Sequence, residues 1–404
     1  MKAKHLLLLI LLFSVAFSAF GYSRITLERT WLIHANDGDS LDFQGALVLN
    51  NSHQRVIAVT AGPGVKQELG EGGTLKLHYK GKMNGSSMWI NATAIVDVDY
   101  DTSLHSDPPL PSANRSFTNL TMPDAAIEAQ ARTLAQQNSS LATIRDLVNW
   151  VHSSMKYDVS YWGQVVPANE VFRDRRGVCV EYTHLLISMA RSLGFDTRYV
   201  SGYVYSNSWQ PHAWAEIYVP DYGWLPADAT FGQVGMLEGT HLAIVKGDDQ
   251  ASVYDVLLSD NNATLEARDQ VVSGFFSNDS RQVEVSLYPD NYTYVVTVDI
   301  ANKRPEYVFG SYEFLADSAY GQQEAGIMLL QPYETVRRHY SLNSSNFQEG
   351  YTYTLPVSAA FNDARAEKAV IVSNPRPAGE AAQPQCPAAL ILLSLASAAL
   401  LRQR

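Results

Sequence analysis

The chain contains very few cysteines. Of its 404 residues only Cys179 and Cys386 are cysteine, and neither belongs to a Cys-x-x-Cys pair. Two such distant cysteines give neither a disulfide framework nor a cysteine-based metal site. The ten histidines are scattered without the spacing of metal ligands. The sequence therefore predicts no metal site.

Positive charge is scarce as well. Thirty Lys and Arg stand against 41 Asp and Glu, which gives a formal net charge of -11. No segment combines clustered basic residues with aromatic residues, as nucleic-acid-binding surfaces do. We therefore expect no nucleic-acid partner. The 46% of hydrophobic residues excludes general disorder, and the length predicts two or three domains.

Long apolar runs are confined to the two ends of the chain. Lys2 and Lys4 precede the apolar run 6–20, and small residues around Gly21 offer a cleavage site. This is the layout of a secretory signal peptide over residues 1–21, with an uncleaved N-terminal anchor as the alternative. Between the ends no run approaches the roughly 18 apolar residues of a membrane span. The sequence predicts an exported protein whose body lies outside the membrane.

The C-terminal end predicts a membrane tether. A Pro-rich linker, 374–387, leads into a hydrophobic tail with a basic end, 388–404. The 14 apolar residues 388–401 would span about 21 Å as a helix, against a hydrocarbon core of about 30 Å. This favours a sorting signal or an auxiliary anchor over a permanent span. The tail resembles those of some archaeal surface proteins, and that resemblance implies lipidation of Cys386.

Glycosylation motifs support a location at the cell surface. The chain has ten Asn-x-Ser/Thr sequons where chance would give roughly three. The candidate acceptors are Asn50, Asn84, Asn91, Asn114, Asn119, Asn138, Asn262, Asn278, Asn291 and Asn343.

The body of the chain divides by its hydrophobic periodicity. Alternating runs in 22–103 predict an N-terminal β-sandwich, and 104–123 has the Pro and Ser composition of a linker. Residues 124–270 begin with two helices, 125–136 and 141–155. The period-2 pattern returns in 271–373 and predicts a C-terminal immunoglobulin-like sandwich.

A cysteine at the start of a helix is the first candidate for chemistry. Cys179 is predicted to lie in the first turn of a helix that continues through the apolar segment 183–193 and ends at Gly194. Backbone N–H groups and the helix dipole at this position favour a thiolate and can receive an oxyanion. A buried cysteine is, however, most often only a small apolar side chain. Position alone leaves both explanations open.

Downstream, a predicted β-hairpin brings a histidine close to a carboxylate. Apolar and polar residues alternate in 212–219, as in a β-strand. Residues 220–223 have the composition of a turn, and residues 224–228 form the returning strand. His212 and Asp228 then lie nearly opposite one another, so an Asp–His hydrogen bond is expected. Such a bond fixes the imidazole tautomer and leaves the other nitrogen for a thiol proton. Taken singly, a surface His and a turn-forming Asp are ordinary, and only their joint occurrence with Cys179 indicates catalysis.

Three blocks of sequence resemble the transglutaminase-like superfamily of Cys-His-Asp enzymes over roughly residues 125–232. They are Gly177-Val178-Cys179 with its helix to Phe195, then Arg198-Tyr199-Val200-Ser201-Gly202-Tyr203, then His212-Ala213-Trp214 through Gly223-Trp224, Asp228 and Thr230. The resemblance implies Cys179 as nucleophile, His212 as general base and then acid, and Asp228 as the residue that orients His212. It also implies an α+β fold with a papain-like core, in which the Cys-bearing helix packs on an antiparallel sheet carrying His and Asp.

Further site residues are less well defined. Some members of the superfamily use an upstream Trp or Gln near the oxyanion, which makes Trp162 and Gln164 candidates here. Trp214 and Trp224 could line a substrate channel, although aromatic residues alternating on strands more often pack in a core. No G-x-S-x-G, P-loop, H-E-x-x-H or G-x-G-x-x-G motif is present, and the proposed chemistry needs no cofactor.

The sequence thus predicts a cell-surface thiol enzyme that cleaves amides through a thioester. We expect a peptidase or amidase, with a protein-crosslinking transglutaminase as a variant of the same chemistry. The expected substrate is a protein or peptide amide, for example in a cell-wall or surface-layer protein. The alternative from another class is a non-catalytic adhesin or scaffold built on the same core.

Overall fold

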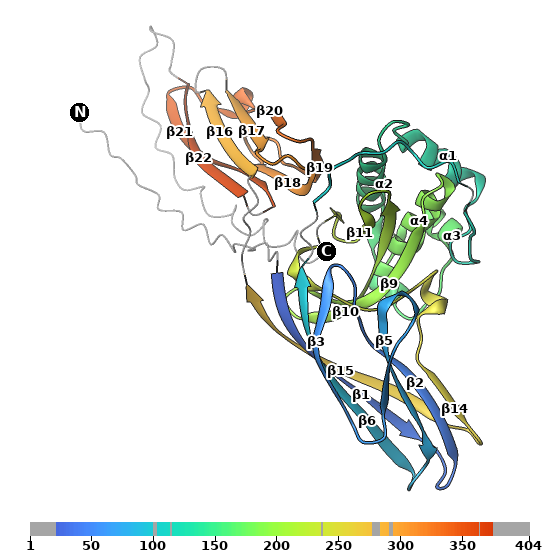
Figure 1. Ribbon diagram of the computed structural model, residues 1–404. Coiled ribbons are helices and arrows are strands. Elements are labelled where there is room, and N and C mark those ends of the chain that lie inside the picture. The colour runs from blue at the N-terminus through green and yellow to red at the C-terminus, as the bar shows by residue number, and fades with distance from the viewer. Residues whose placement is uncertain are drawn as a thin grey trace, which may run out of the picture.

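The computed structural model describes residues 22–99, 103–113, 115–235, 237–276, 283–290, 294–362 and 364–374. The predicted signal peptide 1–21, the tail 388–404, Cys386 and nearly all of the linker 374–387 lie outside the described residues, as do Asn114, Asn278 and Asn291. The described part is mostly β, and its longer helices all lie between residues 125 and 192. Figure 1 shows three parts: an N-terminal sandwich below, a helix-covered sheet above it, and a C-terminal sandwich to one side.

Two four-stranded sheets with a common core form the N-terminal sandwich among the described residues. In one the order is β15 (Thr264–Phe276), β1 (Tyr22–His34), β6 (Ser87–Asp99) and β3 (Gln54–Ala61). In the other it is β14 (Val256–Ser259), β2 (Ser40–Leu49), β5 (Thr74–Lys82) and β4 (Lys66–Leu69). The inward positions of β1 alternate along the strand and bury Ile25, Leu27, Trp31 and Ile33. The period-2 pattern therefore produces the sandwich, as expected from the sequence.

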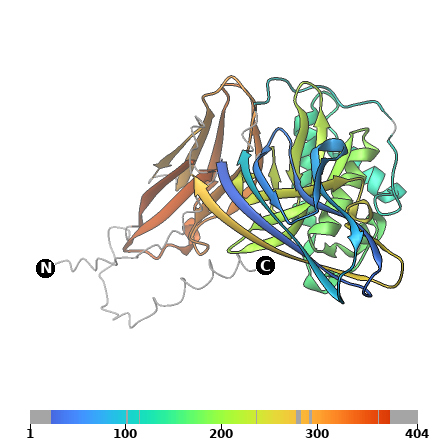
Figure 2. The same cartoon turned by 60° about the horizontal axis from the view of Figure 1, so that its bottom comes forward.

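The last strands of this sandwich come from beyond the segment that carries the longer helices. β15 pairs antiparallel with β1 along its full length, from Tyr22↔Phe276 to His34↔Thr264. β14 adds to the second sheet beside β2. Figure 2 shows β15 lying alongside β1 although the two are more than 200 residues apart. The boundary expected at residue 270 is therefore wrong, because 256–276 belong to the N-terminal sandwich.

The middle part consists of one antiparallel sheet with helices on one face. Its strand order is β12 (Gln233–Val234), β11 (Gly223–Asp228), β10 (Trp209–Val219), β9 (Thr197–Tyr205) and β13 (His241–Gly247). The helices are α1 (Ala125–Leu134), α2 (Ser140–Ser154), α3 (Ala168–Asp174) and α4 (Cys179–Ser192). Asp124 caps α1 and Ser139 caps α2 with side-chain hydrogen bonds to first-turn amides. The predicted α+β core is present, although the described chain as a whole is dominated by strands.

α4 is the central helix of this part. It contacts α1, α2, α3, β9 and β10, and nearly all of its residues are buried. The opposite face of the sheet packs on the N-terminal sandwich, whose hydrophobic core includes Val200, Trp214, Leu242 and Ile244. The sheet is therefore covered on both faces, by helices on one side and by the sandwich on the other.

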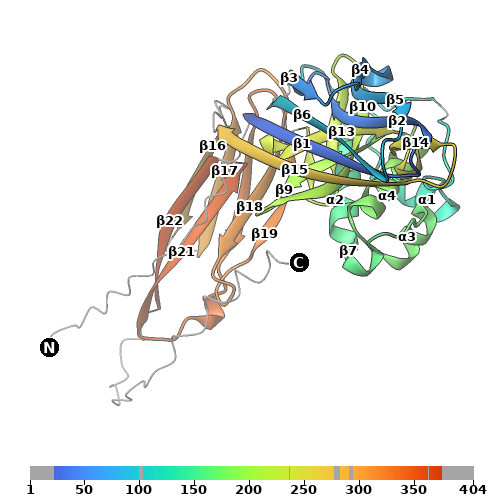
Figure 3. The same ribbon diagram turned by 90° about the horizontal axis from the view of Figure 1, so that it is seen from below.

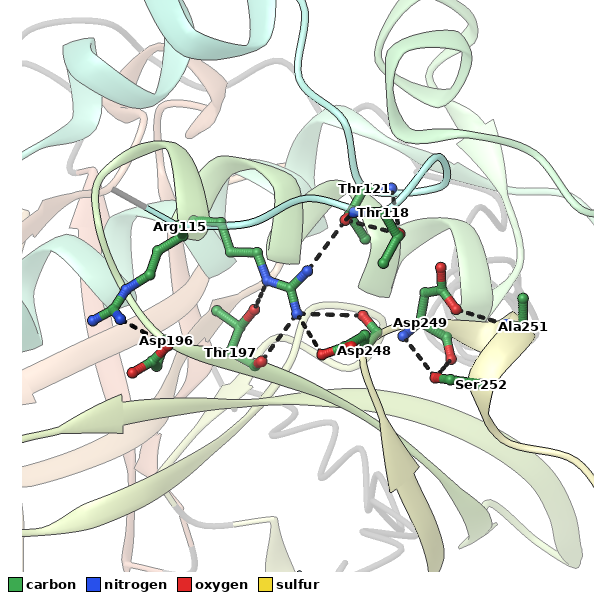
Figure 4. Close-up of polar contacts among 10 residues, drawn as sticks. Arg115, Thr118, Thr121, Asp196, Thr197, Asp248, Asp249, Ala251 and Ser252 are labelled. Atoms are coloured by element: carbon green, nitrogen blue, oxygen red, sulfur yellow. Dashed lines mark hydrogen bonds and ion pairs between the residues drawn. The ribbon is translucent and has the colours of Figure 1, made fainter. Parts of the chain in front are cut away.

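The segment predicted as a linker, 104–123, is docked on the catalytic part. Leu104 and Thr121 are buried, and the Arg115 side chain donates to the carbonyl of Gly194 at the end of α4. The buried Arg191 of α4 donates to Thr121, to Thr197 and to the Asp248 carbonyl, and this network is seen in Figure 4. Polar groups of this segment thus form hydrogen bonds with the end of α4, so the segment is fixed in place and does not act as a free linker.

The C-terminal sandwich is formed by a three-stranded and a four-stranded sheet that share one core. Their orders are β16 (Val283–Asp290), β17 (Val295–Asn302) and β20 (Thr335–Ser341), and β19 (Glu324–Leu330), β18 (Val308–Ala316), β21 (Tyr351–Phe361) and β22 (Ala364–Asn374). The sandwich meets the catalytic part at α2, where the Asn149 side chain exchanges two hydrogen bonds with the Ile327 backbone. Figure 3 shows the rest of it projecting away. No helix among the described residues is long and apolar enough to cross a membrane.

Candidate active site

Cys179 is the first residue of α4, as the sequence predicted. Its side chain is 5% exposed and forms no disulfide. The helix begins without a side-chain cap from Val178, and the Glu181 carboxylate instead accepts the Val178 N–H at 2.9 Å. Gly177 is required beside it, because a Cβ there would collide with the Glu181 side chain. The sulfur therefore lies at the positive end of a buried helix, beside backbone N–H groups that can receive an oxyanion.

Glu181 is buried rather than solvated. Its other carboxylate oxygen has no hydrogen-bond partner in the described structure, and burial raises the pKa of the group. Because Glu181 lies in the same helical turn as Cys179, this tendency toward the neutral form limits its repulsion of a thiolate.

The hairpin formed by β10 and β11 brings His212 and Asp228 together. His212 Nε2 lies 2.6 Å from Asp228 Oδ2, and both side chains are buried. The register differs from the one predicted, because Ala215 pairs with Ala227 and the three-residue turn 220–222 shifts the strands. His212 and Asp228 are thus diagonal neighbours, which are still within reach of a histidine.

Asp228 has a full set of hydrogen-bond donors. Its Oδ1 accepts the backbone N–H groups of Thr230 at 2.7 Å and Phe231 at 3.2 Å. Its Oδ2 accepts from His212 and also from a second histidine, His241, whose Nε2 lies 3.1 Å away. Burial alone would raise the pKa of Asp228, but the two histidines outweigh it and hold the pKa far below its usual range. Asp228 is therefore a fixed buried anion.

His212 is coupled to both the carboxylate and the thiol. Burial would lower its pKa, but the charge and hydrogen bond of Asp228, with a further contribution from Cys179, raise it well above the usual value. Because Nε2 is engaged by Asp228, Nδ1 is the nitrogen left to exchange a proton with Cys179. The arrangement can therefore pass a proton between the thiol and one defined imidazole nitrogen.

Two aromatic residues missed by the sequence analysis flank the site. Phe231 is 41% exposed, and its ring centroid lies 5.3 Å from that of His212. Burial and the charges of Cys179, Glu181 and Asp228 raise the pKa of Tyr157 to about 12. Tyr157 therefore lies in the electrostatic environment of the triad, while its side chain stays 40% exposed. The sequence signals that could have identified them were the position of Phe231 shortly after Asp228 and that of Tyr157 before the helix of Cys179.

The predicted accessory residues occupy other places. Trp214 is 1% exposed and packs between the sheet and the N-terminal sandwich, with its ring stacked 6.0 Å from His212. Trp214 packs against the His212 ring on the side of the N-terminal sandwich and does not line an open channel. Trp224 lies at the turn end of the hairpin, four residues and about 13 Å along the strand from Asp228. There it packs under the Arg198 guanidinium at 3.4 Å.

Trp162 and Gln164 lie in an exposed loop before α3. Trp162 is 62% exposed, and the Gln164 side-chain amide donates to the Ser160 carbonyl of the same loop at 2.6 Å. The amide donor of Gln164 is thus already used locally, and its role near the oxyanion stays a prediction, as does that of Trp162.

Three ligand atoms in this site are close enough together to hold a metal ion. They come from His212, Asp228 and His241 and lie within 4.8 Å of one another. Ligand atoms around a tetrahedral zinc are about 3.3 Å apart, given zinc–ligand distances near 2.0 Å. The 2.6 Å separation of His212 Nε2 and Asp228 Oδ2 is shorter than this and is typical of a charge-assisted hydrogen bond. The geometry therefore fits a proton relay better than a metal centre.

The family comparison falls on the same residues. Residues 128–229 match the family model of the transglutaminase-like superfamily. This range contains Cys179, His212 and Asp228 at the positions described above. The match covers the catalytic part alone, and neither sandwich is included.

Related chains extend the comparison. An uncharacterized protein of Mycobacterium tuberculosis is 27% identical over 145 residues, which cover 32% of this chain and 45% of the relative. The chain thus spans less than half of that relative's length. A solved structure from Cytophaga hutchinsonii, named a "Putative Cysteine Protease", matches with a TM-score of 0.50 and 18% identity over 64% of this chain and 92% of that chain. Red sea bream transglutaminase gives a TM-score of 0.23 at 11% identity, over 83% of this chain and 78% of that one.

Proposed function

We propose that the protein is an exported, cysteine-dependent acyl-transfer enzyme that cleaves amide bonds of proteins or peptides at the cell surface. The observation that carries this proposal is the assembly of Cys179, His212 and Asp228 from three separate elements into one buried site, in which Asp228 is hydrogen-bonded to His212 and Cys179 contributes to raising the pKa of His212. A scaffold needs no such arrangement, whereas a thiol nucleophile needs all three groups.

The reaction would proceed in two halves. Cys179 Sγ attacks the substrate carbonyl carbon once its proton has passed to His212 Nδ1, and the oxyanion is received at the start of α4. When the tetrahedral intermediate collapses, the C–N bond breaks and His212 returns the proton to the departing amine. A thioester on Cys179 remains. His212 then deprotonates an incoming water or amine, which attacks the thioester and releases the thiol.

We propose hydrolysis as the second half-reaction. Support comes from the structural likeness to the Cytophaga hutchinsonii protein, which covers 92% of that chain and carries a protease name. The exposed aromatic pair Tyr157 and Phe231 suits a peptide segment with an apolar residue next to the attacked amide. Cell-wall peptides and surface-layer proteins are the proposed substrates.

Export and tethering complete the proposal. The seven sequon asparagines within the described residues, Asn50, Asn84, Asn91, Asn119, Asn138, Asn262 and Asn343, are all exposed, as glycan acceptors must be. Together with the N-terminal leader and the hydrophobic tail, this supports a glycosylated enzyme held at the outer face of a membrane by its C-terminal end.

The proposal is tested by comparing the wild-type protein with Cys179→Ala on a panel of protein and peptide substrates. Three products are measured: new amino termini, released ammonia, and a fluorescent primary amine joined to protein. We expect thiol-dependent release of new termini or ammonia without incorporation of the amine. Incorporation that exceeds hydrolysis would instead identify a transamidase. The same products from both proteins, or none from either, would favour the scaffold.

The pH dependence of turnover provides a further prediction. The raised pKa of His212 keeps its imidazolium, which donates the proton to the departing amine, intact above the usual histidine range. We therefore expect kcat to hold through neutral pH and to fall only at alkaline pH, where His212 loses its proton. A pH profile measured with one fixed substrate tests this. A fall centred near 6.5 would show that Asp228 does not act on His212 as described.

A further inference from the structure

His241 is a buried imidazole that the predicted triad does not include. It begins β13, is 1% exposed and donates from Nε2 to Asp228 Oδ2 at 3.1 Å. Its other nitrogen, Nδ1, lies 3.2 Å from the Thr240 hydroxyl, which can donate to it, and 2.6 Å from the Leu237 carbonyl, which accepts when the ring carries both protons. The ring is thus held at both nitrogens.

The contact matters because Asp228 Oδ2 is the atom on which His212 depends. Oδ1 is already used by two backbone N–H groups, so His212 and His241 share the remaining oxygen. Because Asp228 is fully buried, a second donor on Oδ2 fixes its position and takes part of its negative charge. Both effects act on the orientation of His212 and on how tightly it holds its proton.

The N-terminal sandwich holds His241 in place. The Ser23 hydroxyl of β1 donates to the Gly239 carbonyl, two residues before His241. Leu237 packs in the sandwich core together with Trp214, and the His241 ring meets the Trp214 ring edge-on at 5.2 Å. A strand near the start of the chain therefore anchors the turn that carries His241.

We propose that His241 is a positioning residue of the Cys179–His212–Asp228 site and that the N-terminal sandwich maintains it there. The inference rests on the proposed thiol chemistry. It also assigns a supporting role to the N-terminal sandwich, which lies outside the family match. Because His241 is buried and donates to Asp228, we infer that it acts through Asp228 and not on the substrate.

The test compares three substitutions in the full chain. His241→Phe keeps a ring but removes the donor, His241→Gln keeps an N–H near the Nε2 position, and His241→Asn has a side chain too short to reach it. We expect kcat to fall about 10- to 100-fold for His241→Phe and His241→Asn with KM within about twofold, as for one charge-assisted hydrogen bond lost in the transition state. His241→Gln should recover most of the loss. If His241→Phe fails to fold, the Gln and Asn variants still decide the question.

A matched control is His53→Phe. His53 is also a buried imidazole, but it binds the Trp224 carbonyl and lies outside the Asp228 hydrogen bonds. It should keep the wild-type kcat. Wild-type kcat in both His241→Phe and His241→Asn would overturn the proposal. So would one equivalent of zinc in the purified protein together with loss of turnover on chelation, because the three side chains would then be ligands.

A second readout separates this proposal from the proposed function. In a Cys386→Ser background Cys179 is the only thiol, and its alkylation by iodoacetamide requires no substrate. We expect slower alkylation in His241→Phe and recovery in His241→Gln, because His212 must be held beside the thiol. If the wild type turns nothing over while alkylation follows this pattern, the proposed function fails and the role of His241 stands. Equal alkylation rates in all the variants would overturn that role.

Discussion

Replacing Cys179 by alanine is expected to remove turnover while leaving the fold intact. The side chain is the proposed nucleophile, and no other cysteine lies among the described residues to replace it. We expect kcat to fall by about a thousandfold or more, as when the nucleophile of a catalytic triad is removed. The measurement is product release under saturating substrate, together with the thermal unfolding midpoint of the variant. Loss of the sulfur from a site that is 5% exposed should change that midpoint by only a few degrees.

The control for this experiment is Cys386→Ser, which removes the other cysteine and should retain full turnover. Cys179→Ser is a further comparison, because it keeps a hydroxyl at the start of α4 but with a much weaker nucleophile. Substantial activity in Cys179→Ala would show that the thiol takes no part and would leave the site as a structural element.

Asp228→Asn is expected to preserve the structure and still reduce kcat by about 10³- to 10⁴-fold. The amide oxygen must take the place of Oδ1, because the N–H groups of Thr230 and Phe231 point at it. The amide NH₂ then faces Nε2 of His212 and can only donate to it. His212 must consequently carry its proton on Nδ1, the nitrogen that faces Cys179, and cannot accept the thiol proton.

The same geometry predicts that Asp228→Asn folds well. His241 can accept from the new NH₂ with Nε2 and donate from Nδ1 to the Leu237 carbonyl, so no buried polar group is left unpaired. Asp228→Ala provides the contrast, because it leaves two histidines and two backbone N–H groups without their hydrogen-bond acceptor. This variant should therefore lose stability as well as activity. Near-normal kcat in Asp228→Asn would contradict the assignment of Nδ1 as the thiol-facing atom.

That Cys179, His212 and Asp228 belong to one candidate site could be predicted because their sequence signals are local. A glycine and a cysteine before an apolar helix, and a hairpin with His and Asp near its ends, are visible in short stretches of sequence. The exact register was not predicted, since it depends on a three-residue turn with Asp221 in the left-handed region. His241 could not be found in this way. It reaches Asp228 only because β13 returns beside β9 and because a turn anchored on β1 sets its position.

The extent of the N-terminal sandwich escaped prediction for a related reason. β15 reads as an ordinary strand, and nothing in its composition says that its partner is β1 rather than its neighbours in the C-terminal sandwich. The segment 104–123 has the composition of a linker, yet its Thr121 hydroxyl accepts from Arg191 and its Arg115 side chain donates to the Gly194 carbonyl. Pairing between strands far apart in sequence depends on tertiary packing, which periodicity does not report.

The pairing of β1 with β15 also constrains how the chain can be made. β1 leaves the ribosome among the first strands, but one of its edges stays open until more than 200 further residues have been synthesised. An unpaired strand edge of this length readily joins the wrong partner, and such non-local pairing forms slowly. The sandwich can therefore close only after the whole middle part has emerged, so the N-terminal sandwich and the middle part acquire their final shape late and together, instead of one after the other during translation.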